Sequence, residues 1–165
     1  MHQTLPEFEY LIAIGSNLGD REEHIQGAIE LIGKSIGKPV RVATLYETAP
    51  VGAADQQFLN SALIVLSKLP PAEVLQLLLN IEKVLGRLRE VHWGNRTIDL
   101  DIILVKKNGE PMSVSTESLN VPHPRLLERD FVLCPCAEIA PDWIHPFTLE
   151  TLLDERKNRG FSLPI

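Results

Sequence analysis

The sequence predicts an α+β protein of the ferredoxin-like class, a sandwich in which two helices cover one face of an antiparallel sheet. Two patterns carry this prediction: apolar stretches in the order strand, helix, strand, strand, helix, strand, and an apolar stripe at helical spacing in each helix. The chain has 165 residues, 44% of them hydrophobic and 23% charged, which is typical of one globular domain, 1–165. We expect an added hairpin and C-terminal helices, with 1–8 and 160–165 as loose tails.

The start of the chain predicts a strand followed by a helix. Residues 10–15 form a short apolar run, and 15–19 are typical of a tight turn. Asp20 with Glu23 three residues later indicates a helix start, because the side chain of such a residue accepts a hydrogen bond from the backbone of the other. The expected buried face of this helix comprises Ile25, Ala28, Ile29, Ile32 and Ile36.

The middle of the chain predicts two strands and a second helix. Residues 40–48 and 58–67 alternate well enough for strands. Pro70 and Pro71 open the helix, where a missing N–H does no harm, and Gly86 ends it. The expected buried face of this helix comprises Val74, Leu77, Leu78, Ile81, Val84 and Leu85.

The remaining elements follow a strand at 98–105. Residues 107–110 are typical of a hairpin turn. A helical stretch follows residues 121–125, and a last helix is expected over 149–158.

Charge and composition exclude several classes of protein. A net charge of −6 and an isoelectric point near 5.4 argue against a nucleic-acid-binding protein with a broad basic surface. No apolar run approaches the length that spans a bilayer, and the N-terminus does not resemble a signal peptide. Cys134 and Cys136, separated by one proline, are too close for an unstrained disulfide and lack a second pair for zinc. We therefore expect a cytoplasmic protein with reduced thiols and no nucleic-acid or membrane partner.

The strand at 98–105 carries the strongest functional signal. Strand side chains alternate between faces, so Asp99 and Asp101 share one face with Ile103 and Val105. The other face is expected to be wholly apolar: Ile98, Leu100, Ile102 and Leu104. The two carboxylates are roughly 6–7 Å apart along the strand, and carboxylate oxygens without cysteine or paired histidine suit Mg²⁺. On spacing alone, ordinary charges on a solvated face explain the pair equally well.

A basic segment precedes the acidic pair. Arg87, Arg89 and Arg96 bring three guanidinium groups close together in a chain whose net charge is negative. Arginine forks bind phosphate oxygens bidentately and Mg²⁺ bridges others to carboxylates, so the combination favours a polyphosphate ligand. Trp93 could stack on a flat ring or act as a lid. Solvated side chains at a helix end are the less favoured alternative for the first two arginines, and less so beside the aspartates. Glu82 lies where a helix end favours a cation, which indicates a separate task.

Two further segments contain candidate binding residues. The long loop after Thr48 is bounded by Phe58 and Asn60, so that a hydroxyl, a ring and an amide could hold a small heterocycle. A plain connecting loop explains the same residues. His123 lies between two prolines, and Arg129 follows near enough to bind the same anion, although a lone histidine is more often structural.

These motifs occur in one order along the chain. They are Gly15-Ser16-Asn17 with Gly19, Tyr46-Glu47-Thr48-Ala49-Pro50, Asn60, Gly86-Arg87 with Arg89, Trp93-Gly94 with Arg96-Thr97 and Asp99-Leu100-Asp101, Val121-Pro122-His123-Pro124-Arg125, and Arg129 with Phe131. In this order they resemble the 6-hydroxymethyl-7,8-dihydropterin pyrophosphokinase family of folate synthesis. The resemblance extends from about Tyr10 to about Leu153, and its Arg-Thr-x-Asp-Leu-Asp segment is highly specific to that family.

The resemblance implies a transferase that moves pyrophosphate from ATP, its co-substrate, to the hydroxymethyl oxygen of the dihydropterin and releases AMP. It implies that Asp99 and Asp101 bind two Mg²⁺ ions and are catalytic together with Arg87 and Arg96. The implied pterin-binding residues are Thr48, Ala49, Pro50, Val51, Phe58, Asn60, Trp93 and Phe131. The implied ATP-binding residues are Glu82, Arg89, Trp93, Arg96, Ile102, Asn120, His123 and Arg129. We expect a monomer that acts on these two small molecules.

Two other functions fit parts of the pattern. A metal-dependent phosphohydrolase could use the same aspartates and would release phosphate without any pterin. A ferredoxin-like binding module without chemistry would explain the fold, but it would have no need of a basic segment beside paired carboxylates.

Overall fold

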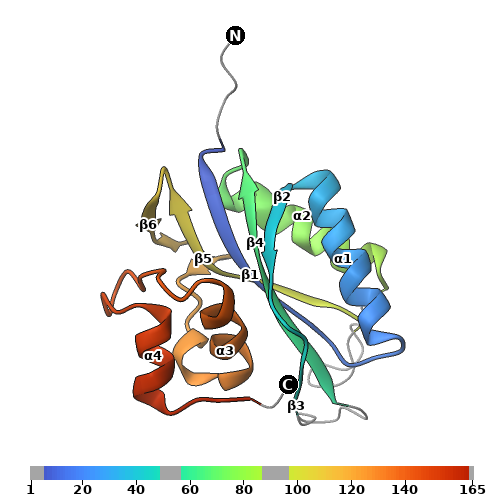
Figure 1. Cartoon of the computed structure of the whole chain (residues 1–165). Helices are drawn as coiled ribbons and strands as arrows, with labels where there is room; N and C mark the ends of the chain where they lie inside the picture. Colours follow the sequence, from blue (N-terminus) through green and yellow to red (C-terminus); the bar gives the residue numbers. More distant parts are fainter. Residues whose placement is uncertain (1–5, 49–56, 87–96, 164–165) are drawn as a thin grey trace.

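The computed structural model describes residues 6–48, 57–86 and 97–163, and Figure 1 shows its architecture. Its first seven elements are β1 (Phe8–Ser16), α1 (Arg21–Ser35), β2 (Gly37–Val42), β3 (Tyr46–Thr48), β4 (Phe58–Ser67), α2 (Pro71–Val84) and β5 (Asp99–Lys107). There follow β6 (Glu110–Met112), β7 (Val114–Ser115), β8 (Asn120–Val121), a 3-10 helix (Leu126–Glu128), α3 (Asp130–Ile139) and α4 (Leu152–Arg159). The strand-helix-strand-strand-helix-strand order is the predicted one, with its second strand divided into β2 and β3.

The main sheet has the strand order β2-β4-β1-β5-β6, and β3 pairs with the far end of β4. All of its pairs are antiparallel. The helices α1 and α2 cover one face, and α3 and α4 pack against the other (Figure 1). The predicted ferredoxin-like sandwich is therefore confirmed, and the C-terminal helices turn it into three layers with an apolar core on each side of the sheet.

The first helix begins as its sequence predicts. The Asp20 side chain accepts a hydrogen bond from the backbone N–H of Glu23 at 3.1 Å. The predicted stripe packs against the sheet. Ile29 is partly buried, and the other four members are buried: Ile25, Ala28, Ile32 and Ile36. Local capping and periodicity were sufficient here, because both signals act within a few residues.

The second helix departs from its prediction at Val84. Its side chain is 73% exposed, although the sequence pattern assigned it to the buried face. The buried stripe follows Val74, Leu78 and Ile81 and continues to Leu85, which is ~100° further round the helix axis than Val84. Gly86 then ends the helix at a φ of +84°, as predicted.

Strand β5 contains an irregularity that its sequence did not reveal. Leu11 on β1 lies opposite Leu104, but the next residue, Ile12, lies opposite Ile102, so Ile103 is an extra residue in β5. Beyond Ile103 the side chains of β5 change faces. Leu104 packs in the apolar core between the sheet and α3, called here the α3 core, and Val105 packs in the core between the sheet and the helices α1 and α2, called here the α1–α2 core. The prediction that Leu104 shares a face with Ile102 is therefore wrong.

The predicted strand over 40–48 is interrupted at its middle. The backbone N–H of Ala43 donates to the carbonyl of Ala62 on β4, but the N–H of Thr44 donates to the carboxylate of Glu138 on α3. The chain thus leaves the ladder at Thr44 and rejoins β4 at Tyr46. A second irregularity lies in β2, where the register shifts between Pro39 and Arg41.

Phe8 and Phe161, which the sequence assigned to loose tails, both pack in the fold. Phe8 is buried and begins β1, and Phe161 packs against the α3 core after Gly160 has ended α4. The last helix begins at Leu152, capped by the Thr151 hydroxyl, because Leu149 adopts a positive φ of 64°. A membrane span needs about 20 apolar residues, and no helix within the described ranges meets that requirement.

Gly37 and Gly33 provide a matched test of packing at the sheet edge. A Cβ on Gly37 would lie 1.9 Å from the carbonyl oxygen of Leu66, so Gly37→Ala must displace β4. We expect it to lower the free energy of unfolding by about 3 kcal/mol. On Gly33, inside α1, the nearest atom would be Pro39 Cδ at 3.6 Å, an ordinary contact. We expect Gly33→Ala to raise stability by roughly 0.5–1 kcal/mol, and urea denaturation measures both values.

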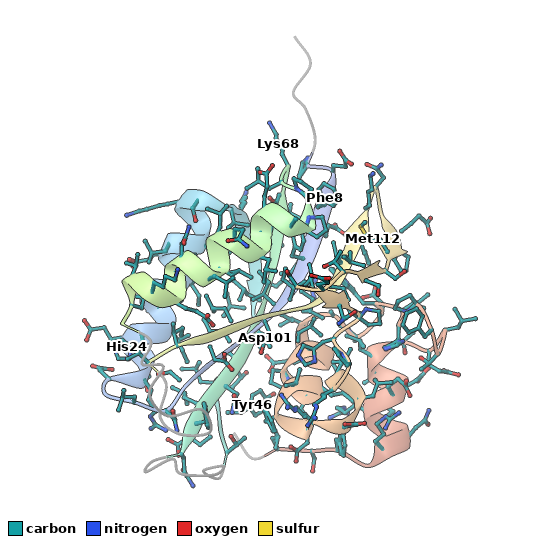
Figure 2. All side chains as sticks on the ribbon, turned by 180° about the vertical axis from the view of Figure 1, so that it is seen from behind. Phe8, His24, Tyr46, Lys68, Asp101 and Met112 are labelled. Atoms are coloured by element: carbon teal, nitrogen blue, oxygen red, sulfur yellow. The ribbon has the colours of Figure 1, made fainter. Side chains whose placement is uncertain are left out.

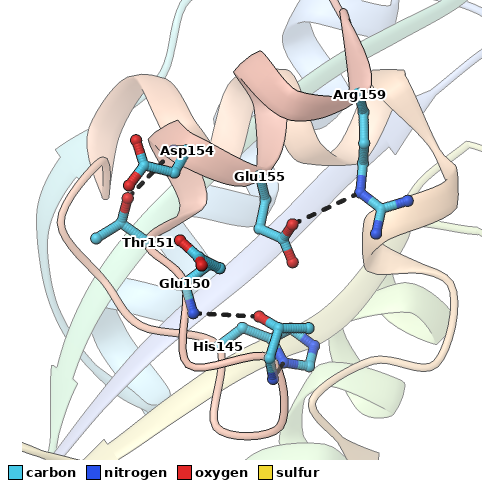
Figure 3. Close-up of polar contacts among 7 residues, drawn as sticks. His145, Glu150, Thr151, Asp154, Glu155 and Arg159 are labelled. Carbon is cyan, nitrogen blue, oxygen red and sulfur yellow. Dashed lines mark hydrogen bonds and ion pairs between the residues drawn. The ribbon is translucent and has the colours of Figure 1, made fainter.

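The loop before α4 is organised around His145 (Figure 3). Its ring nitrogen Nδ1 accepts hydrogen bonds from the backbone N–H groups of Phe147 and Thr148, at 3.2 and 3.3 Å. Burial lowers the pKa of His145, and Arg159 lowers it further, whereas Glu155 opposes the change. The folded chain therefore holds this imidazole neutral, with its proton on Nε2.

The lowered pKa of His145 predicts a loss of stability in acid. Below the ordinary value near 6.5 the unfolded chain binds a proton that the folded loop resists, so the free energy of unfolding falls as the pH drops from 6.5 towards the folded pKa. We expect His145→Asn, which keeps an acceptor for both N–H groups but cannot titrate, to show a weaker fall. Urea denaturation at pH 7.5 and 5.5 measures the two slopes; equal slopes would contradict the prediction.

Candidate functional site

Asp99 and Asp101 lie at one end of the sheet, on the face that α3 covers. They lie opposite Gly15 and Ala13 of β1, and both side chains are partly buried. Figure 2 shows the labelled Asp101 and Tyr46 towards one end of the sheet, and Phe8 and Lys68 towards the other. The carboxylates thus belong to a half-buried surface on the α3 side of the sheet, which argues against ordinary solvated charges.

The sheet between the carboxylates and Asn60 presents only small residues to the α3 side. Gly15 lies between Asp99 on β5 and Asn60 on β4, and in the next row Ala13 lies between Asp101 and Ala62. A Cβ on Gly15 would come within 3.0 Å of the Asn60 side-chain oxygen and 3.7 Å of the Phe58 ring. The three small residues Gly15, Ala13 and Ala62, called here the sheet floor, bring no long side chain to this part of the sheet; Gly15 is buried, and Ala62 is buried in the core that includes α3.

Gly15 is a candidate site residue that the sequence analysis did not select, because 15–19 were interpreted as a turn. Gly15 and Ser16 instead belong to β1. The available signal was that residues 8–16 continue an extended apolar pattern through the glycine.

The amide of Asn60 and the hydroxyl of Thr48 lie together at the far side of the sheet floor. Asn60 is buried, and its Nδ2 donates a hydrogen bond to Thr48 Oγ1 at 2.7 Å. Phe58 lies two residues before Asn60 and shares its face, and Phe131 on α3 is partly buried against the core beneath that face. Four of the predicted pterin-binding residues are therefore brought to one face of the sheet.

His123 is held close to the acidic pair by the irregularity in β5. Its backbone N–H donates to the carbonyl of Ile103, the extra residue, at 3.0 Å. Its ring Nδ1 accepts from the Arg125 N–H at 3.1 Å, which leaves the proton on Nε2. Burial lowers the pKa of His123 and Arg129 lowers it further, while the nearby Asp99 opposes the change. His123 therefore offers a neutral N–H donor beside Asp99.

Arg129 stands at the N-terminal end of α3. Its backbone carbonyl accepts from Leu133 at 2.9 Å, and its guanidinium carbon is 5.7 Å from the centre of the Phe131 ring. Its influence on the pKa of His123 places the cation on the same side of the site. The two residues that were predicted to bind one anion are thus neighbours.

Glu82 and Ile102 face away from the carboxylate pair. Glu82 is 2% exposed, and its Oε2 accepts the backbone N–H of Leu100, between the two aspartates, at 2.9 Å. Ile102 is 3% exposed within the α1–α2 core, so its side chain cannot line a nucleotide site on the opposite face and only its backbone could.

Asn120 is exposed on β8, where its Oδ1 accepts from the Ser115 hydroxyl at 3.4 Å. Seven predicted site residues, including Trp93, which was predicted to contact both substrates, lie outside the described residues: Ala49, Pro50, Val51, Arg87, Arg89, Trp93 and Arg96.

The donor set of the acidic pair suits a hard divalent ion. Within the described ranges, no group of three or more His, Cys, Asp or Glu side chains is arranged to hold a metal. Mg²⁺ in phosphate-transfer sites commonly uses only one or two carboxylates and takes its remaining ligands from substrate phosphates and water. Two carboxylates on one face of a strand therefore fit Mg²⁺ supplied together with a polyphosphate.

Comparisons with known proteins show the family to which the chain is similar. Residues 11–141 match the family described as 7,8-dihydro-6-hydroxymethylpterin-pyrophosphokinase (HPPK). The chain is 50% identical over 130 residues to the 2-amino-4-hydroxy-6-hydroxymethyldihydropteridine pyrophosphokinase of Bacillus subtilis (strain 168), covering 78% of this chain and 75% of that protein. It is 44% identical over 138 residues to the mitochondrial folate synthesis bifunctional protein of Pisum sativum, covering 83% of this chain but 26% of that protein.

A solved structure shares the fold. The crystal structure of Plasmodium falciparum HPPK-DHPS A437G with SDX-DHP superposes with a TM-score of 0.74 at 14% identity, covering 95% of this chain and 46% of that chain. The chain therefore spans about three quarters of the bacterial relative, and only a minor part of the plant and Plasmodium proteins.

Proposed function

Because this chain belongs to the 7,8-dihydro-6-hydroxymethylpterin-pyrophosphokinase family, we propose that it transfers the pyrophosphoryl group of ATP to 6-hydroxymethyl-7,8-dihydropterin. The hydroxymethyl oxygen forms a bond to the β-phosphorus, the bond from that phosphorus to the α–β bridging oxygen breaks, and AMP leaves. The hydroxymethyl proton passes to solvent. The observation that carries the proposal is the half-buried Asp99–Asp101 pair beside the sheet floor.

Asp99 and Asp101 would hold two Mg²⁺ ions at the phosphates of ATP. When bound, the ions neutralise charge on the phosphoryl oxygens and help to align the reacting groups. Glu82 on α2 holds this part of β5 from the other face of the sheet, since its carboxylate accepts the N–H of Leu100, which lies between the two aspartates. The pair is thus attached to a rigid element, as a site that acts by positioning requires.

His123 and Arg129 would contact the triphosphate from the α3 side. A neutral imidazole with its proton on Nε2 donates one hydrogen bond, and the guanidinium supplies charge and a bidentate fork. We assign Arg87 and Arg96 to the transferring phosphates as catalytic residues. Further nucleotide contacts are assigned to Arg89, Trp93, the backbone of Ile102, and Asn120, whereas the buried Glu82 supports the site through the Leu100 N–H.

The dihydropterin would lie on the sheet floor between the carboxylates and Asn60. There its amide-like edge meets Thr48 and Asn60, and its ring meets Phe58 and Phe131, with Ala49, Pro50, Val51 and Trp93 completing the site. This pose directs the hydroxymethyl group towards Asp99 and Asp101, where the β-phosphorus is held. Catalysis then rests on orientation and electrostatics.

Product analysis by chromatography tests the proposed reaction. The protein is given ATP, Mg²⁺ and the dihydropterin, with parallel reactions that omit the pterin or the metal. We expect AMP and a pterin diphosphate in equal amounts, and only when the pterin and Mg²⁺ are both present. Formation of ADP, phosphate or pyrophosphate regardless of pterin would instead identify a phosphohydrolase. ATP binding without turnover would identify a binding module.

A further inference from the structure

Strand β3 is held in place by side chains from both neighbouring layers. It has only three residues, Tyr46–Thr48, paired with Asn60, Leu59 and Phe58 of β4. Each of its three side chains makes a hydrogen bond or ion pair, although a strand of this length presents little area for packing. We propose that Glu138 and Arg21 are positioning residues for the pterin, because they fix β3 so that Thr48 meets Asn60. This inference rests on the proposed function.

On the α3 side, Glu138 gathers the chain that leads into β3. Its carboxylate accepts the Tyr46 hydroxyl at 2.6 Å, and the Thr44 hydroxyl and N–H at 3.0 Å each. Tyr46 itself is buried directly opposite Asn60, in the row that continues through Gly15 to Asp99. The Glu138 carboxylate thus fixes the position of Tyr46 at the end of this row, and with it the position of β3 beside β4.

On the other side, Arg21 joins the two chain segments that flank residues 48–56. Its Nη2 pairs with Glu47 Oε1 at 2.7 Å, and its Nη1 donates to the carbonyl of Gln57 at 2.9 Å. Glu47 precedes Thr48, and Gln57 precedes Phe58 at the start of β4. A single guanidinium therefore ties the beginning of β4 to the middle of β3.

The position of Arg21 in its helix supports a role outside that helix. It is the first residue of α1, directly after the cap Asp20. The helix dipole disfavours a cation at this end, where Glu22 and Glu23 are the favourable residues. Removing the guanidinium therefore leaves α1 at least as stable, so that a loss of pterin affinity in Arg21→Ala reports on the contact with β3.

The chain contains a natural control for the Tyr46–Glu138 contact. Tyr10 and Tyr46 are its two tyrosines, both are buried, and each hydroxyl donates at 2.6 Å. Tyr10 donates to the carbonyl of Leu69, away from Asp99 and Asn60, at the other end of the sheet. Burial raises the pKa of both phenols, that of Tyr46 to about 12, so both remain protonated donors at neutral pH.

The test compares Tyr46→Phe, Glu138→Ala and Arg21→Ala with Tyr10→Phe in steady-state kinetics. We expect each of the first three to raise the KM for the dihydropterin about fivefold, while kcat and the KM for ATP stay within twofold. Tyr10→Phe should lower the melting temperature without changing either KM. Glu138→Gln, which keeps an acceptor for the Tyr46 hydroxyl, should recover most of the pterin affinity.

A double variant sharpens the result. Tyr46→Phe combined with Glu138→Ala should raise the pterin KM no more than Glu138→Ala alone, because both changes remove the same contact. An unchanged pterin KM in Tyr46→Phe and Arg21→Ala, with only a lower melting temperature, would overturn the inference even if Glu138→Ala folds poorly. A wild-type protein without pterin-dependent AMP would instead refute the proposed function, which separates the two failures.

Discussion

Replacing Asp101 by asparagine is expected to lower kcat at least a hundredfold, about 2.7 kcal/mol of transition-state stabilisation. The change keeps the size of the side chain and its place opposite Ala13, but it removes one of two negative charges that suit Mg²⁺. We expect the melting temperature to change little, because Asp101 is only partly buried. Steady-state kinetics at saturating ATP and pterin, with Mg²⁺ varied, measure the effect.

Asp142→Asn is the matched control for this change. Asp142 is an exposed aspartate after α3, in a turn remote from β5 in the chain, and the same neutralisation there should leave kcat within twofold. An Asp101→Asn protein that retained more than a tenth of wild-type kcat would contradict the metal-binding role. Loss of activity together with loss of folding would point to a structural carboxylate, and circular dichroism distinguishes that outcome.

Replacing Gly15 by alanine is expected to raise the Kd for the dihydropterin about thirtyfold, equivalent to about 2 kcal/mol. The new Cβ would lie 3.0 Å from the Asn60 side-chain oxygen, so the amide that donates to Thr48 must shift by a few tenths of an ångström. The methyl group would also occupy the sheet floor where the flat ring is proposed to lie. Calorimetric titration of the dihydropterin and of MgATP measures the two affinities separately.

We expect the affinity for MgATP to change less than threefold in Gly15→Ala. His123 and Arg129, the proposed triphosphate contacts, belong to the segment that leads into α3 and not to β1. Gly33→Ala serves as the control for adding a methyl group at a glycine that does not line the site. Equal weakening of both ligands would mean that the substitution disturbs β1 as a whole, and the proposed pterin position would then be wrong.

The elements predicted well from the sequence depend on near neighbours in the chain. The cap at Asp20 and the hairpin turn at Asn108 and Gly109, with φ values of 52° and 83°, each involve a few consecutive residues. Local motifs also selected the acidic pair and His123, and the fold brings Asp99 and His123 close together. By contrast, the extra residue at Ile103 shows only when β5 is aligned with β1, so its side-chain alternation could not be predicted.

The two proposed positioning residues, Glu138 and Arg21, make contacts between residues far apart in the chain. Glu138 meets Tyr46 across 92 positions and Thr44 across 94, and Arg21 meets Glu47 across 26. A carboxylate near a helix end and an arginine at a helix start both resemble solvated surface residues. Their role emerges only once the fold brings α1 and α3 to the two sides of β3.

The irregular edge strand β2 has a consequence for how the protein behaves at high concentration. An open sheet edge can recruit another strand, and β2 displays Val40 and Val42, which are 44% and 46% exposed. Pro39 lacks an N–H, and the register shift beside it breaks the even spacing of backbone groups that an incoming strand would need. The charged side chains of Lys38 and Arg41 add repulsion between copies. β2 therefore discourages edge-to-edge aggregation despite its apolar surface.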